Sequence, residues 1–326
     1  MTGAPPKTLV GHDEAWREWR GAEAGTRMHH GWILAGPQGV GKGSFARAAA
    51  AQLVAEPGVH QPEPHSHPDI LIPEYPPATK EDEKKRAAGE PYAQKRSITV
   101  DEIRAMQRRL NTRPTLGSRR VVILDCADDL EKSAVNALLK SLEEPPVGTY
   151  FLLVAHRIGR LLPTIRSRCR ILRFAPLDDA QIDVILADAA PQADAATRAA
   201  AIAAAQGSPG VALEFVSEAL APVHNLMQRL VREGDAGFIL RGALSAEIGG
   251  RPSRQRIAAA FELARAVLAE GVRTAPRAQA AKIIEAHAAI IRLGTEAPTY
   301  NYDPGLLAME IGSLLASAAM PREAAH

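Results

Sequence analysis

The sequence predicts an α/β domain with a mostly parallel sheet, followed by two all-helical domains. Up to Pro176, compact apolar runs alternate with helical stretches, a pattern that places helices on both faces of a parallel sheet. The first apolar run leads into a glycine-rich loop and then a helix. After Pro176 the strand signal vanishes and amphipathic helices remain. The expected domains are residues 1–176, 177–220 and 221–326.

Composition indicates a soluble protein with more than one domain. The 326 residues exceed what one compact core usually holds, and 46% of them are hydrophobic. A formal net charge of +2 does not suggest a chain that holds DNA tightly by itself. The two cysteines, Cys126 and Cys169, form no CxxC pair, which excludes a disulfide framework and a four-cysteine zinc module. With no signal-peptide core and no apolar run of membrane-spanning length, we expect a cytoplasmic protein without a membrane partner.

Each element of the first domain is expected from a local pattern. A helix is expected over 101–111, and Thr99 before it and Glu102 in its first turn have the Thr-x-x-Glu spacing of a capping box. The segment 75–96 is rich in Lys, Glu and Pro and almost free of apolar residues, so we expect a mobile charged insertion outside the core. The expected strands are 31–35, 70–72, 121–125, 151–155 and 171–174, and the other helices are 13–23, 43–53 and 131–143.

Residues 36–42 have the pattern of a phosphate-binding loop. Gly36, Gly41 and Lys42 match Gly-x-x-x-x-Gly-Lys, and Gly39 lies inside the loop. Backbone N–H groups of such a loop surround phosphates, and the dipole of the following helix adds to the attraction. The loop could therefore hold ATP or ADP, and the sequence leaves open whether it does.

Two positions needed for hydrolysis differ from an active site. Gly43 stands where Ser or Thr would bind Mg²⁺, and Ser44 is rotated by about 100° around the helix. Asp125 ends the third expected strand, where an aspartate would hold the metal through water. Cys126 follows, at the position where hydrolysing relatives carry glutamate. A thiol with a reference pKa of about 8.5 is a poor replacement for a carboxylate base at that position. The sequence thus predicts a degenerate nucleotide site without a metal of its own.

Two longer motifs resemble those of the clamp-loader family of AAA+ proteins. Residues 136–146, Asn-Ala-Leu-Leu-Lys-Ser-Leu-Glu-Glu-Pro-Pro, are similar to the stretch that follows the metal-holding strand in that family. Residues 162–169 resemble its Ser-Arg-Cys motif. The resemblance covers about Gly11 to Leu220 and points to subunits of the delta-prime type in bacterial DNA polymerase III, through segments 29–32, 67–69, 207–210 and, more weakly, 301–304.

The resemblance implies roles that spacing alone does not give. Arg168 would be an arginine finger that reaches the γ-phosphate of ATP on a neighbouring subunit, a task that suits a planar, permanently charged guanidinium. Gly210 stands where active relatives carry a sensor arginine. Because Gly43, Cys126 and Gly210 each remove a different part of one site, we expect a rigid, non-hydrolysing subunit. Its partners would be a tau/gamma-type ATPase, a delta subunit and, through the complex, the sliding clamp and primer–template DNA.

Alternatives remain open at three points. Arg168 could instead only pair with an acidic group on the surface of its own chain. Arg104, Arg108 and Arg109 would contact the DNA backbone if their helix faces the central chamber of the ring, or they form a solvated basic face. The alternative function is a catalytically active P-loop NTPase of the clamp-loader or helicase-loader type. A third, weaker interpretation is a stand-alone AAA+ adaptor unrelated to replication.

Overall fold

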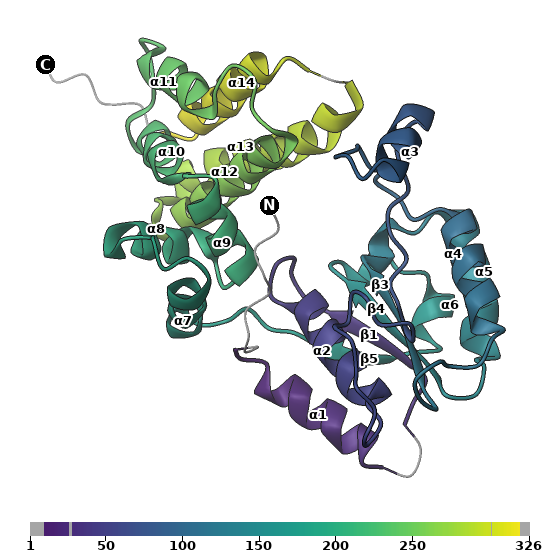
Figure 1. Cartoon of the computed structure of the whole chain (residues 1–326). Helices are drawn as coiled ribbons and strands as arrows, with labels where there is room; N and C mark the ends of the chain where they lie inside the picture. The colour runs from purple at the N-terminus through teal and green to yellow at the C-terminus, as the bar shows by residue number, and fades with distance from the viewer. Residues whose placement is uncertain (1–9, 26–27, 301, 320–326) are drawn as a thin grey trace, which may run out of the picture. The chain divides into compact units, whose positions relative to one another are not determined.

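The computed structural model divides into two compact units at the junction between Leu177 and Asp178 (Figure 1). It describes residues 10–25, 28–300 and 302–319. Residues 1–9 and Asn301, which belong to segments considered in the sequence, lie outside the described residues. Each unit is described by itself.

The first unit is built on a five-stranded parallel sheet with strand order β2-β3-β4-β1-β5. The predicted parallel sheet is confirmed. β1 aligns Gly31 with Phe151 of β4 and Trp32 with Arg170 of β5. Because the strands are parallel, their carboxyl ends lie on the same side of the sheet, and the loops after β1, β3 and β4 come together there. The strands are β1 (Gly31–Ala35), β2 (Ile70–Leu71), β3 (Arg120–Asp125), β4 (Thr149–Ala155) and β5 (Arg170–Arg173).

Helices cover both faces of this sheet, and each face has its own core (Figure 1). On one face, Trp16 and Trp19 of α1 and Phe45 of α2 pack with Trp32. On the other face, the cluster joins α4, α5 and α6 to the opposite side chains of the same strands. The helices are α1 (Asp13–Glu23), α2 (Lys42–Val54), α4 (Val100–Leu110), α5 (Lys132–Glu143) and α6 (Pro163–Arg166), with short 3₁₀ turns η1 (Ala127–Asp129) and η2 (Ile158–Arg160).

A buried ion pair fixes the start of β3. The Arg120 guanidinium lies 3.3 Å from Asp69 Oδ1, and both side chains are almost fully buried. Asp69 also accepts hydrogen bonds from the backbone N–H groups of Thr115 and Leu116, each at 2.8 Å. Burial raises the pKa of Asp69, but these N–H donors and Arg120 outweigh it, so that the net pKa is lowered. Arg120 is therefore structural and not part of a basic surface.

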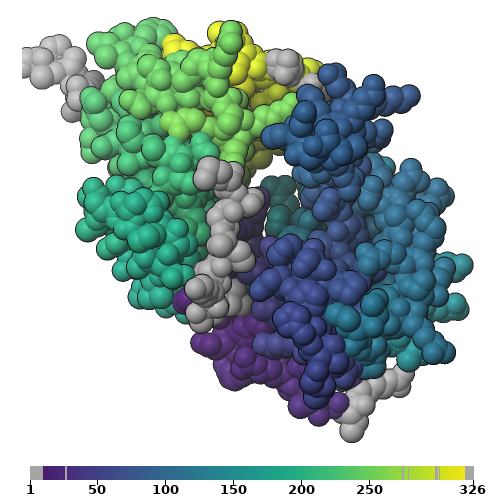
Figure 2. Space-filling view, in the orientation of Figure 1, coloured from purple at the N-terminus to yellow at the C-terminus, as the bar shows by residue number. Residues whose placement is uncertain are grey.

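The charged insertion contains regular structure that its composition does not predict. Helix α3 (Lys80–Ala87) begins at Thr79, whose hydroxyl oxygen accepts a hydrogen bond from the Asp82 N–H. The buried Asp82 carboxylate accepts the N–H of Ala93, and a short antiparallel bridge joins Pro77 to Gln94. The segment forms a lobe on the surface of the first unit (Figure 2). It lies outside both hydrophobic clusters except for Tyr75, which packs against the second.

Thr99 is the N-cap residue of α4, but its side chain accepts no capping hydrogen bond, so the predicted capping box is not formed.

The described residues of the second unit are all helical apart from their connections. Ser208 caps α9 by accepting the N–H of Val211, and Gly210 lies in the first turn of that helix. No helix in the described ranges is both long and apolar enough to cross a bilayer. The helices are α7 (Asp179–Ala189), α8 (Ala195–Ala205), α9 (Pro209–Ser217), α10 (Ala221–Glu233), α11 (Ile239–Ile248), α12 (Arg254–Thr274), α13 (Arg277–Tyr300) and α14 (Pro304–Ser317).

Candidate functional site

The phosphate loop connects β1 to α2 in the expected order. Steric constraints explain why three of its positions are glycine. Gly39 and Gly41 have φ values of 76° and 104°, which residues with a side chain rarely adopt. At Gly36, a Cβ atom would come under 3.0 Å from the carbonyl oxygen of Phe174. The three glycines therefore set both the turn and its close packing against the chain that follows β5.

Lys42 begins α2 and is directed into its own loop. Its ammonium group donates hydrogen bonds to the carbonyl oxygens of Gly36, at 2.7 Å, and Pro37. Only 2% of the residue is exposed, and burial lowers its pKa against the opposing effect of Cys126, Asp125 and Asp128 nearby. The lysine thus lies at the phosphate position with its ammonium group held by the loop backbone.

The Asp125 carboxylate lies so close to Gly43 that it leaves no room for a side chain there. A Cβ atom at Gly43 would lie under 3.0 Å from Asp125 Oδ2, a separation that real Cβ atoms do not adopt. A Ser or Thr at position 43 therefore does not fit beside Asp125 in its present position. Asp125 also lies 3.7 Å from a guanidinium nitrogen of Arg47, one turn further along α2. The place of the metal-binding hydroxyl is thus filled by other groups.

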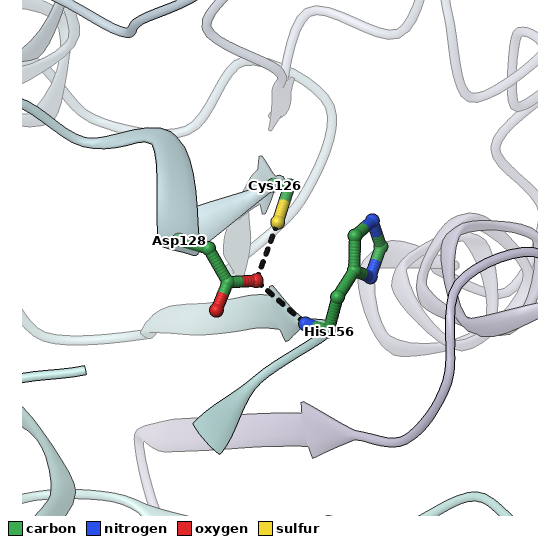
Figure 3. Close-up of side chains that lie close together, drawn as sticks. All are labelled: Cys126, Asp128 and His156. Atoms are coloured by element: carbon green, nitrogen blue, oxygen red, sulfur yellow. Dashed lines mark hydrogen bonds between the residues drawn. The ribbon is translucent and has the colours of Figure 1, made fainter. Parts of the chain in front are cut away.

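A second cluster, formed by Cys126, Asp128 and His156, joins the ends of β3 and β4 (Figure 3). The Cys126 thiol donates to Asp128 Oδ2 at 2.7 Å, and the backbone N–H of His156 donates to the same oxygen at 2.6 Å. The N–H of Arg157 donates to Asp128 Oδ1 at 3.1 Å. Asp128 therefore ties the two strand ends together.

The electrostatics of this cluster disfavour a general base. Burial, followed by the hydrogen bond to Asp128, raises the pKa of Cys126 to about 12, so the thiol stays protonated at neutral pH. Burial also lowers the pKa of His156, which keeps its imidazole neutral. The cluster has sulfur, oxygen and nitrogen donors within 4.8 Å of one another, the donor types that zinc accepts. The three bonds to Asp128 come from the thiol and two backbone N–H groups, and the buried Nδ1 of His156 has no hydrogen-bond partner among the described residues. Because the thiol is protonated, we assign no metal to this cluster.

Asp128 and His156 were not singled out from the sequence. Each follows a strand that ends at the edge of the sheet carrying the phosphate loop. Their position after two apolar runs could have identified them, because strand ends of a parallel sheet converge there.

Arg168 lies at the amino ends of the strands, opposite to the carboxyl ends that carry the phosphate loop. It precedes β5, and its backbone carbonyl and the neighbouring Cys169 are next to Gly31, the first residue of β1. The five residues of β1 separate these amino ends from the phosphate loop by about 16 Å. The guanidinium donates to the Thr164 carbonyl at 2.9 Å and pairs with Glu143 at 2.7 Å. Arg168 is half-buried, and it does not lie at the nucleotide site of its own chain.

The three arginines of α4 are exposed. Arg104 lies 3.5 Å from Asp101, and Arg109 donates to the Pro68 carbonyl at 2.8 Å. Arg108 lies between them in sequence, near the C-terminal end of the helix. Arg104 and Arg108 are one turn apart and lie on the same side of α4, whereas Arg109 lies on another side of the helix, against the Pro68 carbonyl.

The family model described as "DNA polymerase III, delta subunit" matches residues 11–178 of this chain. The chain belongs to this family. The "DNA polymerase III subunit delta'" of Pseudomonas aeruginosa is 32% identical over 208 residues, which are 60% of this chain and 58% of that protein. The "DNA polymerase III subunit tau/gamma" of Haemophilus influenzae is 30% identical over 234 residues, 66% of this chain and 31% of that protein. The chain thus spans less than two thirds of these relatives.

The solved structures support the fold. A "dna polymerase iii, gamma subunit-related protein" from Thermotoga maritima superposes with a TM-score of 0.50 at 19% identity, over 93% of this chain and 99% of that one. Together with the sheet order and the loop after β1, this confirms the predicted α/β module with a parallel sheet and a phosphate-type loop, followed by helical parts.

Proposed function

We propose that this chain is a delta-prime-type subunit of the DNA polymerase III clamp loader that hydrolyses no ATP and supplies Arg168 to the ATP site of a neighbouring subunit. It would act in the cytoplasm as the rigid member of a ring that loads the sliding clamp on primed DNA. In this proposal, residues 177–220 form a lid and residues 221–326 join a collar with the partner subunits.

The position of Arg168 carries the proposal. An arginine at the amino ends of the strands lies about 16 Å from the loop at their carboxyl ends. It therefore cannot reach a phosphate bound in its own chain. If it serves a phosphate, that phosphate is bound to another molecule; the alternative is that Arg168 only pairs with Glu143 on its own surface. Its half-buried side chain is held by Glu143 and Thr164, which limits the freedom lost when it meets a phosphate.

The state of the chain's own loop supports the absence of turnover. The neutral thiol of Cys126 stands where a carboxylate would activate water, and Asp125 fills the space beside Gly43. Gly210 in α9 has no side chain to contact a phosphate. These residues fit neither Mg²⁺ coordination nor base catalysis.

The partners follow from the family and its relatives. Since one relative is a tau/gamma subunit, we expect an ATPase of that kind as the neighbour that receives Arg168, with a delta subunit completing the ring. Arg104, Arg108 and Arg109 would contact the backbone of primer–template DNA inside it, and their alternative role is a solvated basic face.

The test uses the full chain with the tau/gamma-type ATPase and delta subunits. Arg168→Ala should leave the ring assembled but remove hydrolysis at the adjacent site, where an arginine finger is worth about 10³-fold or more. Arg166→Ala, an exposed arginine two residues away, is the matched control. An unchanged DNA-stimulated ATPase with Arg168→Ala would exclude the finger.

The alternative, an active P-loop NTPase, predicts Mg²⁺-dependent ATP turnover by the isolated chain that Lys42→Ala abolishes. An isolated AAA+ adaptor predicts that no clamp-loader subunit co-purifies with the tagged chain.

A further inference from the structure

The residues beside the phosphate loop do not fit the divalent cation that such loops use. Mg²⁺ takes oxygen ligands in near-octahedral geometry, and here the hydroxyl of position 43 is missing. The Asp125 carboxylate lies against Gly43 instead of leaving room for a metal and its waters. The mismatch therefore concerns the shape of the site as well as one missing ligand.

The guanidinium group of Arg47 lies beside Gly43 and the Asp125 carboxylate. It follows Gly43 by four residues, so both lie on the same side of α2. One guanidinium nitrogen is 3.7 Å from Asp125 Oδ2, and the other is 3.2 Å from the place of a Cβ atom at Gly43. A partly exposed guanidinium group thus stands next to the aspartate that would otherwise hold a metal.

Arg47 supplies a positive charge beside the loop. Lys42 and Arg47 are cationic and Asp125 is anionic, which leaves one positive charge at these three positions before the nearby Asp128 carboxylate is counted. In a metal-dependent site, the lysine and Mg²⁺ against two carboxylates leave the same excess. Replacing glutamate by the neutral Cys126 and Mg²⁺ by Arg47 preserves it. Guanidinium groups bind phosphate oxygens well, through charge-assisted hydrogen bonds in a planar fork.

We propose that Arg47 replaces the divalent cation, so that the loop binds the phosphates of a nucleoside diphosphate or triphosphate without Mg²⁺. This rests on the proposed role of the loop as a non-hydrolysing nucleotide site. Bound nucleotide then stays intact and stiffens the first unit, whatever the supply of magnesium.

The experiment is calorimetric titration of the full chain with ADP, once in excess EDTA and once in excess Mg²⁺. The dissociation constants should agree within about twofold, and Arg47→Ala should weaken binding in EDTA by about tenfold or more, as expected for hydrogen bonds to a charged group. Arg17→Ala, an exposed arginine on α1, is the matched control and should bind like the natural chain. Arg47→Lys keeps a charge and should bind with intermediate affinity, which tests the site if Arg47→Ala unfolds.

Binding that requires Mg²⁺, the absence of binding in EDTA, or an Arg47→Lys variant that binds as tightly as the natural chain would each overturn this inference. None of these results affects the proposed finger, which is tested through Arg168. ATP turnover by the isolated chain would count against this inference and also against the proposed absence of hydrolysis.

Discussion

Replacing Gly43 by serine restores the residue type that a metal-dependent loop uses, and we predict that it destabilises the protein. The added Cβ atom would come under 3.0 Å from Asp125 Oδ2, so the carboxylate must move out and leave its position 3.7 Å from Arg47. Forcing an extra group into a packed site costs about 1–3 kcal/mol, and the better helix propensity of serine returns a few tenths. The net loss should be about 1–2 kcal/mol.

Tryptophan fluorescence measures this loss in the correct unit. The chain has three tryptophans, and Trp16, Trp19 and Trp32 are all buried in the first unit beside α2. For a unit of this size, the net loss corresponds to a lowering of Tm by about 3–6 °C. Thermal unfolding followed by tryptophan emission therefore reports on Gly43 without interference from the helical unit.

Two further variants make the test specific. Gly21→Ser, in a helix where no atom lies within 4 Å of the added Cβ, should leave Tm unchanged or slightly higher. Adding Asp125→Ala to Gly43→Ser should recover most of the loss, because the clashing oxygen is gone. If Gly43→Ser unfolds at the same temperature as Gly21→Ser, the steric argument is refuted.

Three other predictions concern buried groups. Asp69→Asn should destabilise the first unit by about 3–5 kcal/mol, because it leaves the Arg120 guanidinium buried without its counter-charge; a loss under about 1 kcal/mol in urea unfolding would contradict this. Because the folded-state pKa of Asp69 is lowered, its contribution is present above the unfolded pKa near about 3.9 and is lost as pH falls through the folded value, so Asp69→Asn should flatten the acid limb of the stability–pH curve. Burial raises the pKa of Cys126 and of the partly buried Cys169 to about 12, so iodoacetamide at about pH 8 should label both far more slowly in the native chain than in urea; equal rates would contradict this protection.

Much of the first unit could be predicted because its strands are continuous apolar runs. The runs ending at Ala35, Asp125 and Ala155 are buried on both faces of the sheet, so burial and sequence pattern agree. The helix over 80–87 was missed because apolar periodicity does not produce it. Its stability comes from the Thr79 cap and the buried Asp82, which are interactions of single polar residues.

The candidate site was predictable only in part. The loop residues and Asp125 were found because a motif fixes their spacing along the chain. The partnership of Gly43 with Asp125 and Arg47 was not, because it depends on how far β3 approaches α2 in space. Likewise, the pairing of β3 with β4 brings Asp128 to His156, 28 residues away. Nor does the sequence reveal that Arg120 points inward to Asp69.

The most direct test of the account compares two variants of this chain in one assay, the DNA-stimulated ATPase of the reconstituted ring. Lys42→Ala removes the lysine of its own loop, and Arg168→Ala removes the proposed finger at the opposite edge of the sheet. We expect the ring with Lys42→Ala to hydrolyse ATP at the natural rate, whereas the ring with Arg168→Ala loses turnover at the neighbouring site. A ring slowed by Lys42→Ala and indifferent to Arg168→Ala would contradict this expectation.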